Sequence, residues 1–326
     1  MKIIFLNRLN RFWHERIGEL INEFGYVDFV TEPERAHSEI ETANAIVSGD
    51  ISVEFIQKAR RLRMIFVPFA GVDALPLGYM REHGIAVSNA HGNAPYVAER
   101  CIAMALAFYG KIIDYHNDLR ESRWHGFAAK RGVRDTWDSL QGRSCAVIGT
   151  GEIGKHVARF LRAFGCRVVG FKRRPVEERP EFFDEITLNL GEALENSELI
   201  FICLPLTRET KGLFSAEILG KLEGRFLINV GRAQVVNEEA LYRSLKDGIL
   251  RGAAIDVWYA YPQDSKGRGD PSRYPIHQFP NVVLSPHIAG FTPQSARMNI
   301  EQTIENIRCY LRTGKPRFVV DTELMY

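Results

Sequence analysis

The chain has 326 residues, of which 45% are hydrophobic and 25% are charged. These are the proportions of a globular protein, and the length is sufficient for two domains of ordinary size. The 42 basic and 40 acidic side chains leave a formal net charge of only +2. Because electrostatic binding of nucleic acid or of a membrane surface usually takes a one-sided basic patch, this balance argues against both roles.

The five cysteines are scattered, odd in number and mostly within apolar runs (Cys101, Cys145, Cys166, Cys203 and Cys309). None belongs to a CxxC pair, so reduced core thiols are favoured over disulfides or a zinc site, and no metal is expected. No apolar run approaches the roughly 18 residues of a membrane span. Residues 1–6 have the pattern of a first strand and lack the form of a signal peptide. We therefore expect a cytoplasmic protein.

Short apolar runs alternate with helix-like segments from end to end, which is the pattern of a parallel α/β architecture. In the first part, the expected strands are 3–6, 45–47, 64–67 and 86–87, with helices over 15–24 and 53–61. A long apolar helix is expected from Ala94 to about Tyr115, followed by a polar stretch over 120–141. The second set of strands is expected at 145–148, 167–171, 199–203, 226–230, 252–256 and 282–284, before a last helix over 292–311.

This order of elements predicts two doubly wound domains, each with a parallel sheet. A Rossmann-type dinucleotide-binding domain, residues 96–290, is expected to be inserted into a flavodoxin-like substrate or catalytic domain formed by residues 1–95 and 291–326. A ligand is then expected in the cleft between the two domains, outside the carboxyl ends of the strands.

The glycine-rich segment Gly149-Thr150-Gly151-Glu152-Ile153-Gly154 follows the strand at 145–148 and precedes a helix-patterned stretch. That order predicts a dinucleotide-binding turn, with an ordinary strand–helix turn as the alternative. Gly149 permits a tight turn, Gly151 lets the backbone approach a pyrophosphate, and Gly154 lets the helix pack closely on the strand. The helix N-terminus then offers unpaired N–H groups and a positive dipole end to the phosphates.

Three successive strands of the second domain end in polar side chains, namely Arg232, Asp256 and His287. Because the carboxyl ends of parallel strands meet at one edge, we expect the three to converge where a nicotinamide would lie. An arginine can hold the carboxylate of an α-keto acid in two hydrogen bonds. A histidine can give a proton to a forming alkoxide and take it back in reverse. The alternatives are a surface arginine, a turn-capping aspartate and a core histidine.

The chain resembles the D-2-hydroxyacid dehydrogenase family over nearly its whole length. The matching blocks are, in order, Phe69-Ala70-Gly71-Val72-Asp73, Val97-Ala98-Glu99, the glycine-rich segment, Leu204-Pro205-Leu206-Thr207-Arg208-Glu209-Thr210-Lys211-Gly212, Asn229-Val230-Gly231-Arg232, Ala254-Ile255-Asp256-Val257 and Ser285-Pro286-His287-Ile288-Ala289-Gly290. The resemblance implies that Arg232 binds the substrate, that His287 is the acid/base, and that Asp256 lies near the nicotinamide. It also implies a homodimer.

The same resemblance implies which further residues contact the ligands. The substrate carboxylate is expected to be held by the backbone amides of Ala70, Gly71 and Val72, together with Arg232 and His287. The cofactor is expected to contact the glycine turn and the later blocks, at Gly149, Thr150, Gly151, Glu152, Ile153, Gly154, Leu204, Pro205, Thr210, Val230, Gly231, Asp256, His287, Ala289 and Gly290.

One departure from the family concerns the catalytic glutamate, which usually falls five residues after the aspartate. Tyr261 stands there instead. A carboxylate beside a histidine favours the imidazolium, so without one His287 is expected to be a weaker proton reservoir at neutral pH. Tyr261 is a catalytic candidate because its hydroxyl can orient the ring. Asp264 and Asp270, in the segment that follows, are alternative sources of a carboxylate or are solvated loop charges.

The other departure concerns the cofactor. NAD-specific members place an acid roughly 20 residues past the glycines, where it binds the ribose diol. Here the strand at 167–171 runs into Lys172, Arg173 and Arg174. These three cations are either a solvated strand end or partners for the 2′-phosphate of NADP. NADP is therefore favoured over NAD.

The expected function is an oxidoreductase that transfers a hydride between a nicotinamide cofactor, preferably NADP, and a small 2-keto or D-2-hydroxy acid. Reduction of glyoxylate or hydroxypyruvate is one assignment, and oxidation of phosphoglycerate is another. The competing hypothesis is a nucleotide-binding sensor or scaffold of the same fold with little or no turnover, which the missing glutamate allows.

Overall fold

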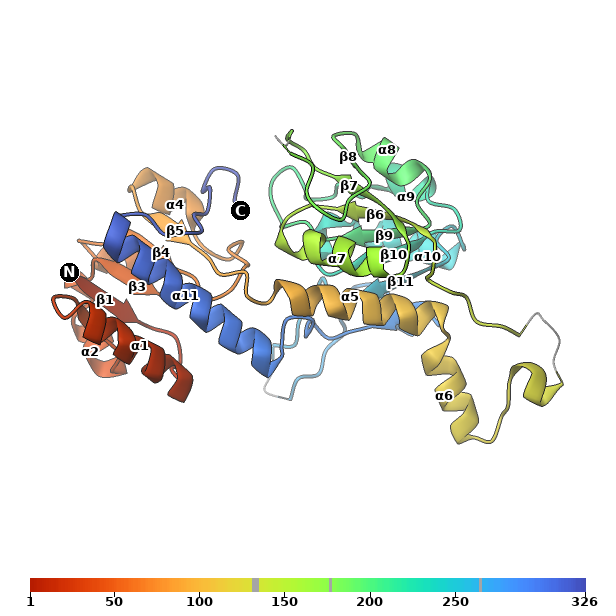
Figure 1. Ribbon diagram of the computed structural model, residues 1–326, viewed down its shortest axis with the longest axis horizontal. Helices are drawn as coiled ribbons and strands as arrows, with labels where there is room; N and C mark the ends of the chain where they lie inside the picture. Colours follow the sequence, from red (N-terminus) through yellow and green to blue (C-terminus); the bar gives the residue numbers. More distant parts are fainter. Residues whose placement is uncertain (131–134, 176–177, 264–265) are drawn as a thin grey trace. The chain divides into compact units, whose positions relative to one another are not determined.

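The computed structural model describes residues 1–130, 135–175, 178–263 and 266–326. The chain forms two compact units, one made of Met1–Asn93 and Phe291–Tyr326 and the other of Ala94–Gly290. Each is an α/β unit built on one parallel sheet (Figure 1). Among the described residues, no helix has both the length and the apolar character that crossing a membrane requires.

The first unit contains a five-stranded sheet in the order β2-β1-β3-β4-β5, which is the flavodoxin-like order. Its strands are β1 (Lys2–Phe5), β2 (Asp28–Val30), β3 (Ala45–Val47), β4 (Met64–Phe66) and β5 (Ala86–Ser88). One face packs against α1 (Arg11–Glu23) and α11 (Pro293–Thr313), and the other against α2 (Pro33–Ser38), α3 (Val53–Lys58) and α4 (Leu77–Glu82). A short 3-10 turn, η1 (Ile40–Thr42), precedes β3.

Helix α1 illustrates why these segments fold locally. The Asn10 side chain accepts a hydrogen bond from the backbone N–H of Trp13, which caps the helix at its start. Trp13, Ile17 and Leu20 then recur at helical spacing and are buried against the sheet and α11. The helix therefore begins four residues before the expected residue 15, because the cap lies upstream of the apolar stripe.

The second unit contains a seven-stranded sheet in the order β12-β11-β10-β9-β6-β7-β8. Its strands are β6 (Ser144–Ile148), β7 (Arg167–Phe171), β8 (Glu185–Thr187), β9 (Leu199–Ile202), β10 (Phe226–Asn229), β11 (Gly252–Ile255) and β12 (Val282–Leu284). Since β6 is the first strand of this unit, the order is that of the Rossmann fold extended by one strand. The loops that follow β7 and β9 therefore flank the loop that follows β6.

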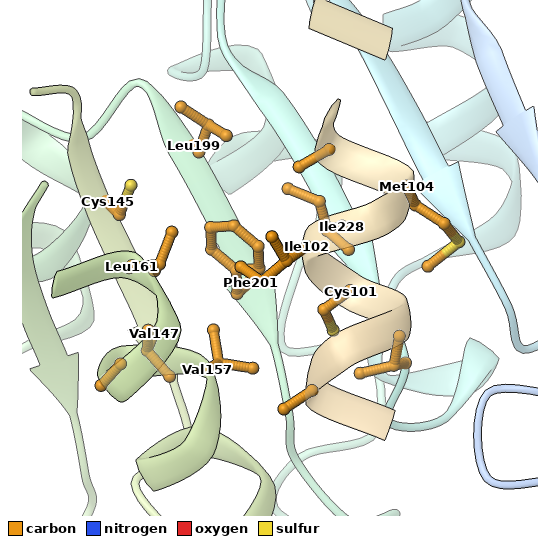
Figure 2. Packing of buried hydrophobic residues seen from close by; sticks show 14 of the residues in the cluster. Cys101, Ile102, Met104, Cys145, Val147, Val157, Leu161, Leu199, Phe201 and Ile228 are labelled. Atoms are coloured by element: carbon orange, nitrogen blue, oxygen red, sulfur yellow. The ribbon is translucent and has the colours of Figure 1, made fainter. Parts of the chain in front are cut away.

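Helices cover both faces of this sheet. Helices α5 (Ala94–Tyr109) and α7 (Glu152–Ala163) pack on one face, and α8 (Leu190–Glu195), α9 (Ala216–Gly220) and α10 (Glu238–Lys246) on the other. Figure 2 shows Cys101 and Ile102 of α5 facing Phe201 of β9 and Val157 of α7. The remaining elements are α6 (Ile112–Arg120), η2 (Gly126–Ala129), η3 (Ala233–Val235) and η4 (Ile276–Gln278).

The long helix expected from Ala94 to about Tyr115 is wrong in its length. It ends at Tyr109, and a separate helix, α6, follows from Ile112. Lys111 between them has φ +48°, a left-handed conformation that no helix continues through. The chain therefore turns between the two helices at Gly110 and Lys111.

Candidate active site

The glycine turn links β6 to α7 with the geometry that its three glycines require. Gly149 has φ +104°, which a residue with a side chain rarely adopts. A Cβ on Gly154 would lie 2.0 Å from the carbonyl oxygen of Gly149, so only glycine lets the helix approach the turn. A Cβ on Gly151 would meet no atom of the described chain within 4 Å. The space in front of Gly151 is open to a ligand.

The turn also contains a polar atom that fits a bound dinucleotide. Thr150 is buried, and its Oγ1 has no hydrogen-bond partner among the described residues. A buried hydroxyl without a partner is unfavourable unless a ligand satisfies it. Together with the N-terminus of α7, this hydroxyl suits a pyrophosphate oxygen. Glu152 receives a 2.8 Å hydrogen bond from Lys155, and Ile153 packs against the core behind the turn.

The three cations expected to hold a 2′-phosphate follow β7. The Lys172 backbone N–H donates to the carbonyl oxygen of Thr187 on β8 at 3.1 Å, which continues the sheet pairing to the strand end. Lys172 and Arg173 are half-buried and Arg174 is exposed. The Arg173 guanidinium pairs with the carboxylate of Glu209. Sequence reasoning gave Glu209 no role, and only its place within the family-like block marked it.

The loops after β9 and β10 lie against each other. A Cβ on Gly231 would be 2.4 Å from the carbonyl oxygen of Leu204, so a glycine is required for this approach. Leu204 and Val230 are buried. Thr210 is fully buried and donates to the carbonyl oxygen of Pro205 at 2.7 Å. Thr210 therefore shapes the loop rather than pointing out of it.

Arg232 follows β10 and is held there by its neighbours. The Asn229 side chain donates to the Arg232 carbonyl oxygen and accepts from the Gly231 N–H, each at 3.1 Å. The Arg232 guanidinium is half-buried and donates to the Gly231 carbonyl oxygen at 2.8 Å. Because β10, β11 and β12 are neighbours in the sheet, Arg232, Asp256 and His287 lie at the same sheet edge.

Asp256 clamps the loop that carries His287. Its carboxylate is 1% exposed and accepts three hydrogen bonds, from Ser285 Oγ at 2.5 Å, Ile288 N–H at 3.0 Å and Ala289 N–H at 3.2 Å. His287 lies between these donors with φ +56°. A left-handed residue with a side chain costs about 1–2 kcal/mol, and the hydrogen bonds to a carboxylate offset that cost.

Tyr261 lies beside His287, with ring centroids 5.4 Å apart and ring planes inclined by 40°. The Tyr261 hydroxyl accepts a hydrogen bond from the Trp258 N–H at 3.1 Å, and the Trp258 indole donates to the Ser285 carbonyl oxygen at 2.8 Å. Trp258 and Ser285 thus connect the loop after β11 to the loop after β12. The sequence placed Trp258 near the site and Ser285 in a family-like block but did not indicate this connection. The Tyr261 ring therefore lies next to this histidine, while its hydroxyl is bonded to the Trp258 N–H.

Asp264 and Asp270 were the two aspartates expected as possible replacements for the glutamate. Asp264 lies outside the described residues. Asp270 is 87% exposed, and its carboxylate is 4.0 Å from Nε2 of His277. The structure therefore brings Asp270 to His277. In the part of the chain that is described, no group of three or more His, Cys, Asp or Glu side chains is arranged to hold a metal ion.

Ala70, Gly71 and Val72 belong to the first unit, in the loop after β4. The Ala70 carbonyl oxygen accepts from the Asn89 side chain at 2.9 Å, and the Val72 carbonyl oxygen accepts from the Leu75 N–H at 3.0 Å. The carbonyl oxygens of Ala70 and Val72 thus have partners, while the N–H groups of Ala70, Gly71 and Val72 donate to no acceptor within the described residues. Consecutive N–H groups of this kind can bind an anion.

The nucleotide-binding sheet and this polar edge define a dinucleotide-dependent enzyme class, and comparison with known proteins narrows it. The model of the D-isomer specific 2-hydroxyacid dehydrogenase NAD binding domain matches residues 102–289. The chain is 30% identical to the glyoxylate reductase of Thermofilum pendens, covering 86% of this chain and 81% of the relative. It is 26% identical to the glycerate dehydrogenase of Methylorubrum extorquens, covering 98% and 99%.

Among solved structures, the NADPH-dependent glyoxylate/hydroxypyruvate reductase of Sinorhizobium meliloti in complex with NADP and malonate is similar with a TM-score of 0.76. It is 25% identical, and the match covers 99% of this chain and 97% of that one. The chain belongs to the D-isomer specific 2-hydroxyacid dehydrogenase family. It is an NAD(P)-dependent oxidoreductase of 2-hydroxy and 2-keto acids, and nothing in these similarities favours the sensor or scaffold alternative.

Proposed function

We propose that this enzyme reduces a small 2-keto acid, glyoxylate or hydroxypyruvate, with NADPH in preference to NADH. The observation that carries the proposal is the arrangement at the ends of β10, β11 and β12, where Asp256 clamps the loop of His287 next to the strand that leads to Arg232. Similarity to a glyoxylate reductase and to a glyoxylate/hydroxypyruvate reductase supports the substrate class.

Each polar residue then has one role. The Arg232 guanidinium binds the substrate carboxylate in a bidentate pair, and the amides of Ala70, Gly71 and Val72 add donors to that carboxylate. The bound nicotinamide supplies the hydride. His287 donates a proton to the carbonyl oxygen of the substrate as it becomes an alcohol. The Tyr261 ring lies beside the His287 ring and helps to keep its orientation.

The cofactor contacts follow the sheet edge of the second unit. The glycine turn and the Thr150 hydroxyl receive the pyrophosphate, with Glu152 and Ile153 starting the helix behind it. Lys172, Arg173 and Arg174 receive the 2′-phosphate. Backbone of the later loops lines the nicotinamide half, at Leu204, Pro205, Val230, Gly231, Ala289 and Gly290. Thr210 and Asp256 act indirectly, because both are buried and hold those loops.

The experiment is the oxidation of NADPH and of NADH, in parallel, with glyoxylate, hydroxypyruvate, pyruvate and phenylpyruvate. We expect turnover of glyoxylate or hydroxypyruvate with a higher kcat/KM for NADPH. A preference for NADH contradicts the assignment of Lys172, Arg173 and Arg174. Tight cofactor binding with no turnover of any keto acid contradicts the proposed substrate class. Oxidation of phosphoglycerate is then the reaction to test.

We also propose that the enzyme is a homodimer. Large apolar side chains are exposed on α6 and in the described residues after it, and the largest exposure is 95% at Phe127 (Ile112, Ile113, Leu119, Trp124, Phe127 and Trp137). His125 steadies this segment between Asp118 and Asp135, whose carboxylates are 2.8 and 3.2 Å from its ring nitrogens. Patches of this kind usually mark a protein interface. Sedimentation analysis should give a dimer, and Phe127→Glu should shift it toward monomer.

The cysteines support a reducing, cytoplasmic location for the enzyme. All five are free thiols, and such thiols are usual in compartments where disulfides do not persist. Burial raises the pKa of the Cys101 thiol, which keeps it protonated and unreactive. Fractionation of the native host should recover the enzyme with cytoplasmic markers, and recovery with secreted proteins contradicts the proposal.

A further inference from the structure

An ion pair spans the glycine turn of the second unit. It joins Arg173, directly after β7, to Glu209 in the loop after β9. Because β7 and β9 are the two neighbours of β6 in the sheet, this pair connects the two loops that flank the turn at Gly149. The cofactor assignment above uses Arg173 for a 2′-phosphate but leaves the carboxylate that faces it unexplained.

The loop that carries Glu209 is fixed by buried hydrogen bonds. The Thr207 N–H donates to Oγ1 of Thr210 at 2.8 Å, and the Thr210 N–H donates to Oγ1 of Thr207 at 3.1 Å. Both threonines are buried, whereas the Glu209 side chain is 66% exposed. The buried threonines therefore fix the backbone of this loop, while the Glu209 carboxylate faces solvent. Its pairing with Arg173 places it at the end of β7, where a ligand can reach it.

We infer that Glu209 is a specificity-determining residue for the adenosine ribose of the cofactor. In dinucleotide-binding sheets that ribose lies at the end of the second strand, here β7, where an acid accepts the hydroxyls of NAD. This chain has no acid among residues 172–174, and Glu209 brings one to the same place from the loop on the other side of the turn. The inference rests on the proposed cofactor site and adds a residue to it.

The carboxylate acts on the two cofactors in opposite directions. It accepts a hydrogen bond from the 2′-hydroxyl of NADH. It repels the 2′-phosphate of NADPH and competes with that phosphate for Arg173. Because the Glu209 side of this ion pair is solvent-exposed and such pairs contribute little net stability, the phosphate can displace Glu209 from Arg173. Glu209 thus reduces the difference in affinity between NADPH and NADH, so that the enzyme can also bind NADH.

Calorimetric titration of the full chain with NADPH and with NADH measures this effect without turnover. In Glu209→Gln, NADPH should bind about threefold more tightly and NADH about threefold more weakly, which moves the ratio of dissociation constants about tenfold toward NADPH. Arg173→Gln should move the ratio toward NADH by about tenfold. Glu217→Gln is the matched control, because it breaks an exposed 2.7 Å pair between Glu217 of α9 and Lys221 directly after that helix. It should leave the ratio unchanged.

The inference is overturned if the ratio in Glu209→Gln stays within about twofold of wild type, moves toward NADH, or moves equally in the control. The proposed function is tested by the wild-type affinities, which are separate from the effect of Glu209→Gln. A wild-type chain that binds NADH more tightly than NADPH contradicts the proposed preference, yet the shift caused by Glu209→Gln is still measured. Binding of neither nucleotide contradicts both.

Discussion

Two stretches of one sheet edge in the second unit are built in opposite ways. At the end of β6, the turn takes its shape from glycines, since Gly149 has a positive φ and Gly154 leaves no room for a Cβ. At the ends of β11 and β12, the shape depends on side chains, and Asp256 bonds to residues 29 to 33 positions further along the chain. The first stretch is a local property of six residues, and the second is a product of tertiary contacts. Substitutions in the first stretch should therefore affect fold stability and cofactor binding, whereas substitutions in the second should affect turnover.

The largest difference is expected from a pair of glycine substitutions in the turn. Gly154→Ala forces a Cβ against the backbone of Gly149, and we expect it to destabilise the fold by about 1–3 kcal/mol and to abolish measurable NADPH binding. Gly151→Ala, its matched control, has room for the methyl group. It should keep its melting temperature and lose only cofactor affinity. Thermal melts with NADPH titrations check both, and equal melting temperatures for the two variants contradict this account of the turn.

Asp256→Asn tests the second stretch. The amide keeps the shape but cannot accept all three hydrogen bonds, so the left-handed conformation of His287 loses support. We expect kcat to fall about 10- to 100-fold through misplacement of the imidazole, while the dissociation constant of NADPH changes much less. Ser285→Ala removes one donor and should have a smaller effect in the same direction. An unchanged kcat in Asp256→Asn shows that the clamp does not position His287.

Substitutions of Tyr261 test how the side chain beside His287 affects protonation of the imidazole. Tyr261→Glu places a carboxylate beside the imidazole and favours its protonated form, so the upper limb of the pH profile for keto acid reduction should move up by about one pH unit. Tyr261→Phe keeps the ring and should leave the limb in place. A limb that is the same in Tyr261→Glu as in wild type shows that this position does not face the proton donor.

Glu238, at the start of α10, should make the stability of the fold sensitive to acid, which is a smaller effect. Burial raises its pKa, but hydrogen bonds from the Arg273 backbone and guanidinium and from Ser272 outweigh this and hold the pKa below 4.5. A depressed carboxyl pKa stabilises the fold above about pH 4.5, and that stabilisation is lost as the pH falls through the folded-state pKa. Glu238→Gln should cost about 1–2 kcal/mol at pH 7 and nothing near pH 2. Urea unfolding at both pH values distinguishes this from a pH-independent loss.

The same contrast explains how much could be predicted from the sequence. Every expected strand is present with its ends within one residue, because each is a continuous apolar run between turns. The strands that were missed, β2 and β8, are three-residue edge strands with only one or two buried positions, too short for a periodic pattern. The glycine roles were also predictable, since spacing alone dictates them.

The parts of the candidate site that escaped prediction depend on long-range contacts. The pairing of Glu209 with Arg173 and the hydrogen bonds that join Ser285 to Asp256 and to Trp258 connect residues that no local pattern relates. Residue type and strand ends indicated that Arg232, Asp256 and His287 share an edge. They did not indicate that the buried Asp256 carboxylate bonds to the loop of His287.

The most direct test of the account is a comparison of wild type with His287→Gln, measured for both turnover of hydroxypyruvate and NADPH binding. The account predicts that kcat falls by about 10²- to 10⁴-fold, the usual contribution of a positioned acid/base, while the NADPH dissociation constant stays near the wild-type value. A variant that retains its rate would contradict the role of His287 and, with it, the assignment of the ends of β11 and β12 as the reacting side of the site.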